Sequence, residues 1–127
     1  MEIERQVDVE YEVYLALKNH VRTYTRPLPK YFSLPCILIT LVGGTQVDKI
    51  DSFDLVLDAR AETEAEANEY LRNAIGILQK QTLDQVTAIR HMELNSTGSW
   101  GTDPVRPNIA MCSARIRVYA HPEQTEV

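Results

Sequence analysis

The sequence predicts an α/β (α+β) domain: a mixed, mainly antiparallel sheet of about four strands with two helices packed on it. Three observations predict this class. An apolar run at residues 35–42 leads into Gly43-Gly44, an acidic alternating stretch follows at Asp51–Arg60, and a capped amphipathic helix begins at Thr63. Segments whose apolar residues have strand spacing, followed by a segment with helical spacing, favour a sheet covered by helices. The expected order of elements is α-β-β-α-β-β.

Length and composition limit the number of domains and the classes of partner. The 127 residues fit one domain, 1–127, in which we expect the polar segment 121–127 to be a flexible tail. The net charge is −5 and the pI is about 5.1. Sequence-independent coating of nucleic acid requires a basic surface, so this balance argues against that role.

The first helix is expected over Val7–Thr23, because apolar residues there follow helical spacing and Asp8 suits the N-cap. The next segment, Thr25–Leu34, contains Pro27 and Pro29. Proline fixes φ and removes a backbone donor, so we expect an extended connection there.

Two strands are expected next. Cys36–Val42 lacks polar alternation, which indicates burial on both faces and a central place in the sheet. Gly43-Gly44 is expected to form a turn, with Thr45–Ile50 as either the far side of that hairpin or a protruding loop. In Asp51–Arg60 every second residue is apolar, so one face should meet the core.

The second helix is expected over Glu64–Lys80. Thr63 and Glu66 have the spacing of a capping box, and the acidic residues of the first turn suit the positive end of the helix dipole. A third strand is then expected over Gln85–Leu94. Ser, Thr, Gly and Pro predict a loop over Asn95–Asn108, and a final alternating strand is expected over Ile109–Tyr119.

Metal, cofactor and membrane roles find no support in the sequence. Cys36 and Cys112 each lie in an apolar strand, which indicates buried thiols, with a disulfide as the alternative. The three histidines are scattered, so we expect neither a metal site nor a cofactor. The longest apolar run is about eight residues against the roughly 20 that span a bilayer, and no secretory signal is evident, so we expect folding in the cytoplasm.

No catalytic set emerges. Asp54 and Asp58 share the polar face of their strand, but spacing alone does not give the separated pKa values that a two-carboxylate hydrolase needs. Ser113 and His91 lack a nucleophile-elbow motif. We therefore expect no catalytic residues.

Two segments suggest contact with a partner. Arg26 and Lys30 precede Tyr31 in a loop that carries no acid, and this loop is either merely ordered or a docking element. Trp100 lies in a Gly/Ser-rich stretch, where it either covers the sheet edge or anchors an interface with Arg106 beside it. The candidate interface residues are Arg26, Lys30, Tyr31, Asp54, Asp58, Trp100 and Arg106.

Taken in order, these features resemble the tail terminator proteins of long-tailed bacteriophages, also called minor tail or tail-completion proteins. The resemblance lies in order and spacing and covers about Val9 to Ala120. Its pieces are the first helix, Leu34-Pro35, Cys36–Val42 with Gly43-Gly44, Asp51–Arg60, Glu64–Lys80, and Asp103-Pro104 with Pro107 before Ile109–Tyr119.

The resemblance implies a structural protein of the virion tail and neck, and no enzyme. Such proteins form a hexameric ring on the tail tube, stop tube elongation and present a surface to the head–tail connector or stopper protein. DNA would pass through the lumen without specific binding. The implied partners are further copies of the chain, the tail tube protein and the connector, with assembly in the host cytoplasm.

A closed ring repeats one heterologous contact, so each copy needs two different patches. The basic segment Arg26–Lys30 and the acidic region Asp48–Glu69, with eight acids against two bases, are candidate complements. Six copies at −5 would carry −30, and acids on the lumen would keep DNA from adhering.

Three alternatives stay open at the level of sequence. One is another neck component, such as a head-completion or stopper protein. Another is a small α/β ligand-binding or regulatory module, which would have a defined pocket. The third is a small hydrolase that uses Asp54 or Asp58.

Overall fold

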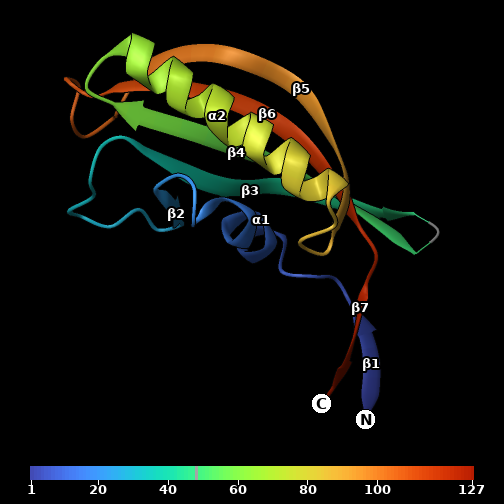
Figure 1. The fold of residues 1–127 in the computed structure, drawn as a ribbon. Coiled ribbons are helices and arrows are strands. Elements are labelled where there is room, and N and C mark those ends of the chain that lie inside the picture. The colour runs from blue at the N-terminus through green and yellow to red at the C-terminus, as the bar shows by residue number, and fades with distance from the viewer. Residues whose placement is uncertain (48) are drawn as a thin grey trace.

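The computed structural model describes residues 1–47 and 49–127, which form two helices on one face of a five-stranded sheet, with a separate two-stranded ribbon (Figure 1). In chain order the elements are β1 (Glu2–Arg5), α1 (Val9–Leu17), β2 (Thr23–Thr25), β3 (Cys36–Val47), β4 (Ile50–Ala61), α2 (Glu64–Leu83), β5 (Ile89–Thr102), β6 (Ala110–Ala120) and β7 (Glu123–Glu126).

The large sheet has the strand order β2-β3-β4-β6-β5. The short β2 runs parallel to β3, and the other three pairs are antiparallel. The expectation of a mixed, mainly antiparallel sheet with two helices on it is confirmed. The expected count of about four strands and the order α-β-β-α-β-β are wrong, because β1, β2 and β7 are short strands that pair with distant segments.

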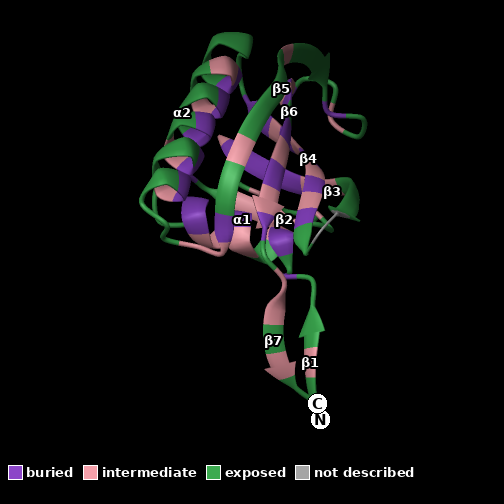
Figure 2. Cartoon of the chain, turned by 90° about the vertical axis from the view of Figure 1, so that its right-hand side faces the viewer, coloured by how far each residue is buried: buried purple, intermediate pink, exposed green. Residues whose placement is uncertain are grey.

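The core lies between the sheet and the helix layer. Alternate residues of β4 and β6 point toward the helices, and Figure 2 shows buried stripes on both layers. Burying this apolar surface, at about 25 cal/mol per Å², is the main favourable term for the fold. The members contributed by these two strands are Phe53, Leu55, Leu57, Ala59, Ala61, Cys112, Ala114, Ile116, Val118 and Ala120.

Both predicted N-caps and the start of the second helix are confirmed, whereas α1 begins at Val9, two residues after the predicted Val7. The Asp8 carboxylate accepts from the Tyr11 N–H at 3.3 Å, and the Thr63 hydroxyl accepts from the Glu66 N–H at 3.2 Å. The first helix is shorter than expected: α1 ends at Leu17, because residues 23–25 pair with β3 instead of continuing the helix. The second, α2, runs on to Leu83, three residues past Lys80.

Gly43-Gly44 forms no turn. Both glycines lie inside β3, where the register shifts between Leu41 and Gly43, and the strand continues to Val47. A Cβ at position 44 would lie 2.7 Å from the Ser52 carbonyl oxygen, so this position requires glycine for close backbone approach. The chain reverses near Lys49, whose φ is 65°. Asp48, inside the acidic region defined above, lies outside the described residues.

The predicted loop at Asn95–Asn108 is also wrong for most of its length. Pairing with β6 extends β5 to Thr102, so Trp100 and Gly101 lie in a strand. Register shifts on both sides of Ser96 accommodate Gly98, whose φ is +81°. A row of backbone groups along β6 therefore overrides the low strand propensity of this polar segment.

The terminal segment 121–127 is not a frayed tail. Its residues Glu123–Glu126 pair with Glu2–Arg5 as an antiparallel ribbon. The two segments stand more than a hundred positions apart in the sequence, so no local pattern reveals the pairing. The ribbon points away from the body of the molecule (Figure 1).

Candidate interaction surfaces

The face of the sheet that turns away from the helices is polar, and two of its aspartates, Asp54 and Asp58, are hydrogen-bonded across strands. Arg117 on β6 stands opposite Asp54 on β4 and donates from Nε to Asp54 Oδ1 at 2.9 Å. The hydrogen bond and charge of Asp54 raise the pKa of Arg117. Asp58 accepts a hydrogen bond from the Ser113 hydroxyl on the same pair of strands. Both candidate aspartates therefore have partners within the chain.

At one end of this polar face lies a cavity of about 470 Å³. Arg60 lines it, and this residue pairs with Cys36 where β3 begins. Two connections cover it, residues 28–32 and residues 103–106. The lining residues are Leu28, Pro29, Lys30, Phe32, Arg60, Asp103, Pro104, Val105 and Arg106.

A buried ion pair stands in the cavity wall. Arg60 donates from Nε to Asp103 Oδ2 at 2.8 Å, and the two side chains are 7% and 6% exposed. The other carboxylate oxygen accepts from the backbone N–H groups of Val105 and Arg106, each at 2.9 Å. Burial alone would raise the pKa of Asp103, but these hydrogen bonds outweigh it and lower the pKa.

Arg60 is not fully satisfied by this pair. Its Nη1 is buried and has no hydrogen-bond partner among the described residues. An unpaired guanidinium nitrogen is costly in a buried site. The sequence did not reveal this pair, because the two residues lie 43 positions apart and the sequence indicated a loop around Asp103.

Two of the predicted interface residues, Lys30 and Arg106, line this cavity, and a third, Tyr31, follows Lys30 in the chain. Arg106 donates to the Lys30 carbonyl oxygen at 3.1 Å and stacks over the Phe32 ring at 5.2 Å. The Lys30 ammonium lies 5.5 Å from the centre of the Tyr31 ring, and Tyr31 is 81% exposed. The cavity thus presents three cations, Lys30, Arg60 and Arg106, against one anion, Asp103.

The other two predicted residues lie elsewhere. Arg26 pairs with Glu10 on α1 at 2.8 Å, so its charge is partly neutralised within the chain. Trp100 lies on the edge strand β5, opposite Cys112, and is half exposed. Arg106 contacts Phe32 and Lys30, as described above.

The acidic region is much smaller at the surface than in the sequence. Asp51 is buried, and Asp54 and Asp58 have the partners described above. Among the described residues of this region, the exposed acids form a patch at the start of α2, made of Glu62, Glu64, Glu66 and Glu69. Glu62 follows the cavity residue Arg60 by two positions, so the acidic patch begins at the same end of β4 as the cavity.

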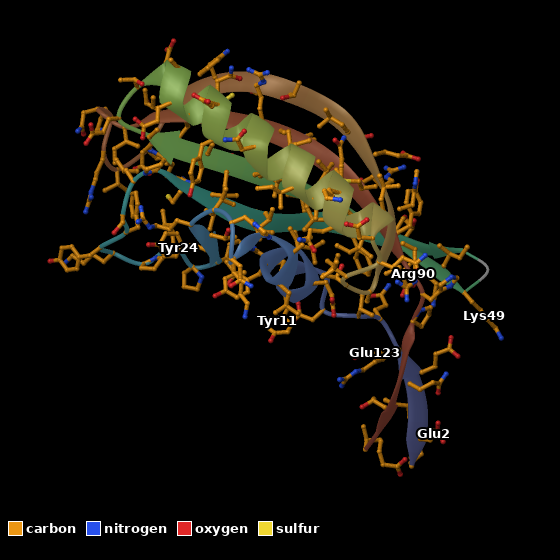
Figure 3. The ribbon with its side chains drawn as sticks, viewed as in Figure 1. Glu2, Tyr11, Tyr24, Lys49, Arg90 and Glu123 are labelled. Atoms are coloured by element: carbon orange, nitrogen blue, oxygen red, sulfur yellow. The ribbon has the colours of Figure 1, made fainter. Side chains whose placement is uncertain are left out.

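The β1–β7 ribbon is the third surface. Arg5 binds Glu123 at 2.7 Å, and Gln124 donates to Glu4 at 3.3 Å. Glu2 and Glu123 lie along it, well away from Tyr24 and the cavity end of the molecule (Figure 3). The ribbon residues include four glutamates and one arginine, so its surface is acidic.

Comparison with known proteins adds no assignment. A scan against protein-family models and a search of curated proteins both give no match. Among residues 1–47 and 49–127, three or more potential metal-ligating side chains nowhere gather into one group. No helix in the same part of the chain is long and apolar enough to cross a membrane.

Proposed function

We propose that this chain is a structural protein of the bacteriophage tail, which forms a hexameric ring on the finished tail tube, ends its elongation and joins it to the head connector. The observation that carries the proposal is the β1–β7 ribbon. It is a two-stranded element that stands away from the body, and its side chains are exposed or half exposed.

An isolated two-stranded ribbon is marginally stable in water. Such an arm gains stability when it packs against another surface, and the sheet and helices of its own chain lie to one side of it (Figure 1). An arm that packs on a neighbouring copy is a natural element of a repeated contact. The proposal of a ring rests on this feature together with the resemblance in element order.

Unlike surfaces on one subunit support the same proposal. The acidic β1–β7 ribbon and the cationic cavity lie at opposite ends of the fold. A ring that closes by rotation repeats a contact between two different patches, whereas a twofold dimer repeats one self-complementary patch. Opposite charges set the register of such a contact more than its strength.

The exposed glutamates at α2 are also suited to a DNA channel. A lumen lined with carboxylates repels the phosphate backbone and lets DNA pass without adhesion. We propose that the acidic patch of each copy contributes to this lining.

Purified tail tubes of a phage that encodes this chain provide the direct test. Incubation with the protein should place a ring at tube ends in negative-stain images and should stop further growth when tube protein is added. Binding along the tube wall, or growth at the unprotected rate, would contradict the proposal. A stopper protein would bind the connector and leave tube growth unaffected.

One observation favours a second candidate function, a small-molecule-binding module. The volume of the cavity lies within the range of about 300–1,000 Å³ that is typical of ligand sites. Its cations and apolar walls suit an organic carboxylate. Titration with sodium hexanoate, followed by amide NMR shifts at residues 28–32 and 103–106, tests this function; unshifted amides would exclude it for this ligand class.

A further inference from the structure

We propose that the cationic cavity receives a glutamate of the β1–β7 ribbon from a second copy of the chain. This inference deepens the proposed function, on which it rests, because it names the two surfaces that make the contact between copies. The cavity supplies Lys30, Arg60 and Arg106, and the ribbon supplies exposed glutamates, Glu2 and Glu4 among them.

The cavity is suited to a carboxylate that arrives from outside. Arg60 is held in the wall by Asp103, but its Nη1 has no partner within the described residues. Lys30 is exposed and forms no ion pair with another described residue. Three cations face one anion, so a further negative charge is electrostatically favoured there.

The cavity is also partly apolar, which bears on the kind of anion. Leu28, Pro29, Phe32, Pro104 and Val105 surround the charged groups. A bare phosphate gains nothing from such walls. A glutamate side chain brings two methylene groups with its carboxylate, and its ribbon neighbours include the half-exposed Ile3.

The ribbon has the complementary charge. It holds four glutamates against one arginine; Glu123 pairs with that arginine, and Glu126 pairs with the N-terminal ammonium. Glu2 has no hydrogen-bond partner among the described residues, and Glu4 accepts one hydrogen bond from Gln124. These two side chains are thus available to a neighbour.

The positions of the two surfaces fit a head-to-tail contact. The ribbon follows Ala120, which pairs with Asp51 near the β3–β4 reversal. The cavity lies at the far end of β4, where Arg60 pairs with Cys36. A ribbon at one end and a cavity at the other cannot meet within one chain, but they can meet between successive copies (Figure 1).

A paramagnetic label tests the contact even when it is short-lived. Thr125→Cys places a reactive thiol on the ribbon, while the native Cys36 and Cys112 are buried. A chain that carries the nitroxide but no 15N is mixed with a 15N-enriched chain that carries no nitroxide. We expect line broadening at the amides of residues 28–32 and 103–106, which report only on contacts between copies.

Charge reversal gives the test its specificity. Lys30→Glu in the enriched chain should abolish the broadening, as should Glu2→Lys with Glu4→Lys in the labelled chain. Combining the two reversed chains should restore it. Arg115→Glu, at an exposed arginine of β6 outside the cavity, is the matched control and should leave the broadening unchanged.

Broadening confined to other surfaces, or its persistence in the Lys30→Glu chain, would overturn the inference. A second outcome would also overturn it: sodium hexanoate suppresses the broadening, and combining the two reversed chains does not restore it. That result would assign the cavity to a free organic carboxylate. A ring that still forms on tail tubes in the Lys30→Glu variant would end this inference and leave the proposed function standing.

Discussion

Arg60 and Asp103 form a buried ion pair at 2.8 Å that ties the central strand β4 to the connection between β5 and β6. Because both side chains are nearly inaccessible to water, neither charge has an alternative partner in solvent. We expect Asp103→Asn to lower the free energy of unfolding by about 3–5 kcal/mol, since it leaves the Arg60 charge buried and unpaired. Urea unfolding followed by circular dichroism measures this loss.

The matched control for that substitution is Asp54→Asn. It removes the same charge from the exposed pair with Arg117, where water screens the interaction. We expect a clearly smaller loss of stability than for Asp103→Asn. Equal losses in the two variants would show that burial of the Arg60–Asp103 pair has no energetic weight.

Low pH should destabilise the fold through protonation of the Asp103 carboxylate. Hydrogen bonds from Arg60 and two backbone N–H groups hold the pKa of Asp103 below its ordinary value of 3.8, so the folded state holds this proton less tightly than the unfolded state does. The stability it contributes is therefore present above the unfolded pKa and is lost as pH falls through the lower, folded value. Unfolding free energies should fall more steeply below about pH 4 for the natural chain than for Asp103→Asn. Parallel curves in that range would contradict the assignment.

The two adjacent glycines of β3 should respond in opposite ways to alanine. A Cβ at position 44 meets the Ser52 carbonyl oxygen at 2.7 Å, whereas a Cβ at position 43 meets nothing within 4 Å. We expect Gly44→Ala to destabilise the fold by about 1–3 kcal/mol, because the backbone of β4 must shift. Gly43→Ala is the internal control and should be neutral or slightly stabilising, as alanine loses less backbone entropy than glycine.

Thermal unfolding of both variants measures the difference. A Gly44→Ala protein as stable as the natural chain would mean that β3 and β4 separate easily at this point. It would also remove the structural reason for glycine inside this strand.

The sequence predicted those elements whose signals are local. Asp8 and Thr63 stand beside the helices that they cap, and the alternation in β4 identifies its buried face without reference to any other strand. In each case the residues that determine the structure lie within a few positions of one another.

The elements that were missed depend on distant partners. The sequence predicted Glu123 to lie in a tail, because its partner Arg5 is 118 positions away. It predicted Trp100 to lie in a loop, because the strand that contains Trp100 forms only by pairing with β6. The cavity follows the same rule. Lys30 and Arg106 were each named as candidate contacts, but their meeting at Arg60 and Asp103 depends on tertiary structure.

Alkaline pH should reveal the burial of Cys36. Burial raises the pKa of its thiol from 9.0 to about 11, against the opposing charges of Arg60 and Arg22. The folded state therefore retains the proton more tightly than the unfolded state, and this contribution is present below about pH 9 and is lost as pH rises toward 11. By the linkage of about 1.4 kcal/mol per pKa unit, the natural chain should lose about 2–3 kcal/mol more than Cys36→Ala over that range. Unfolding free energies of both proteins between these pH values measure it, and every other titrating group cancels in the comparison. Equal losses in the two proteins would mean that the Cys36 thiol ionises as readily in the folded chain as in the unfolded one.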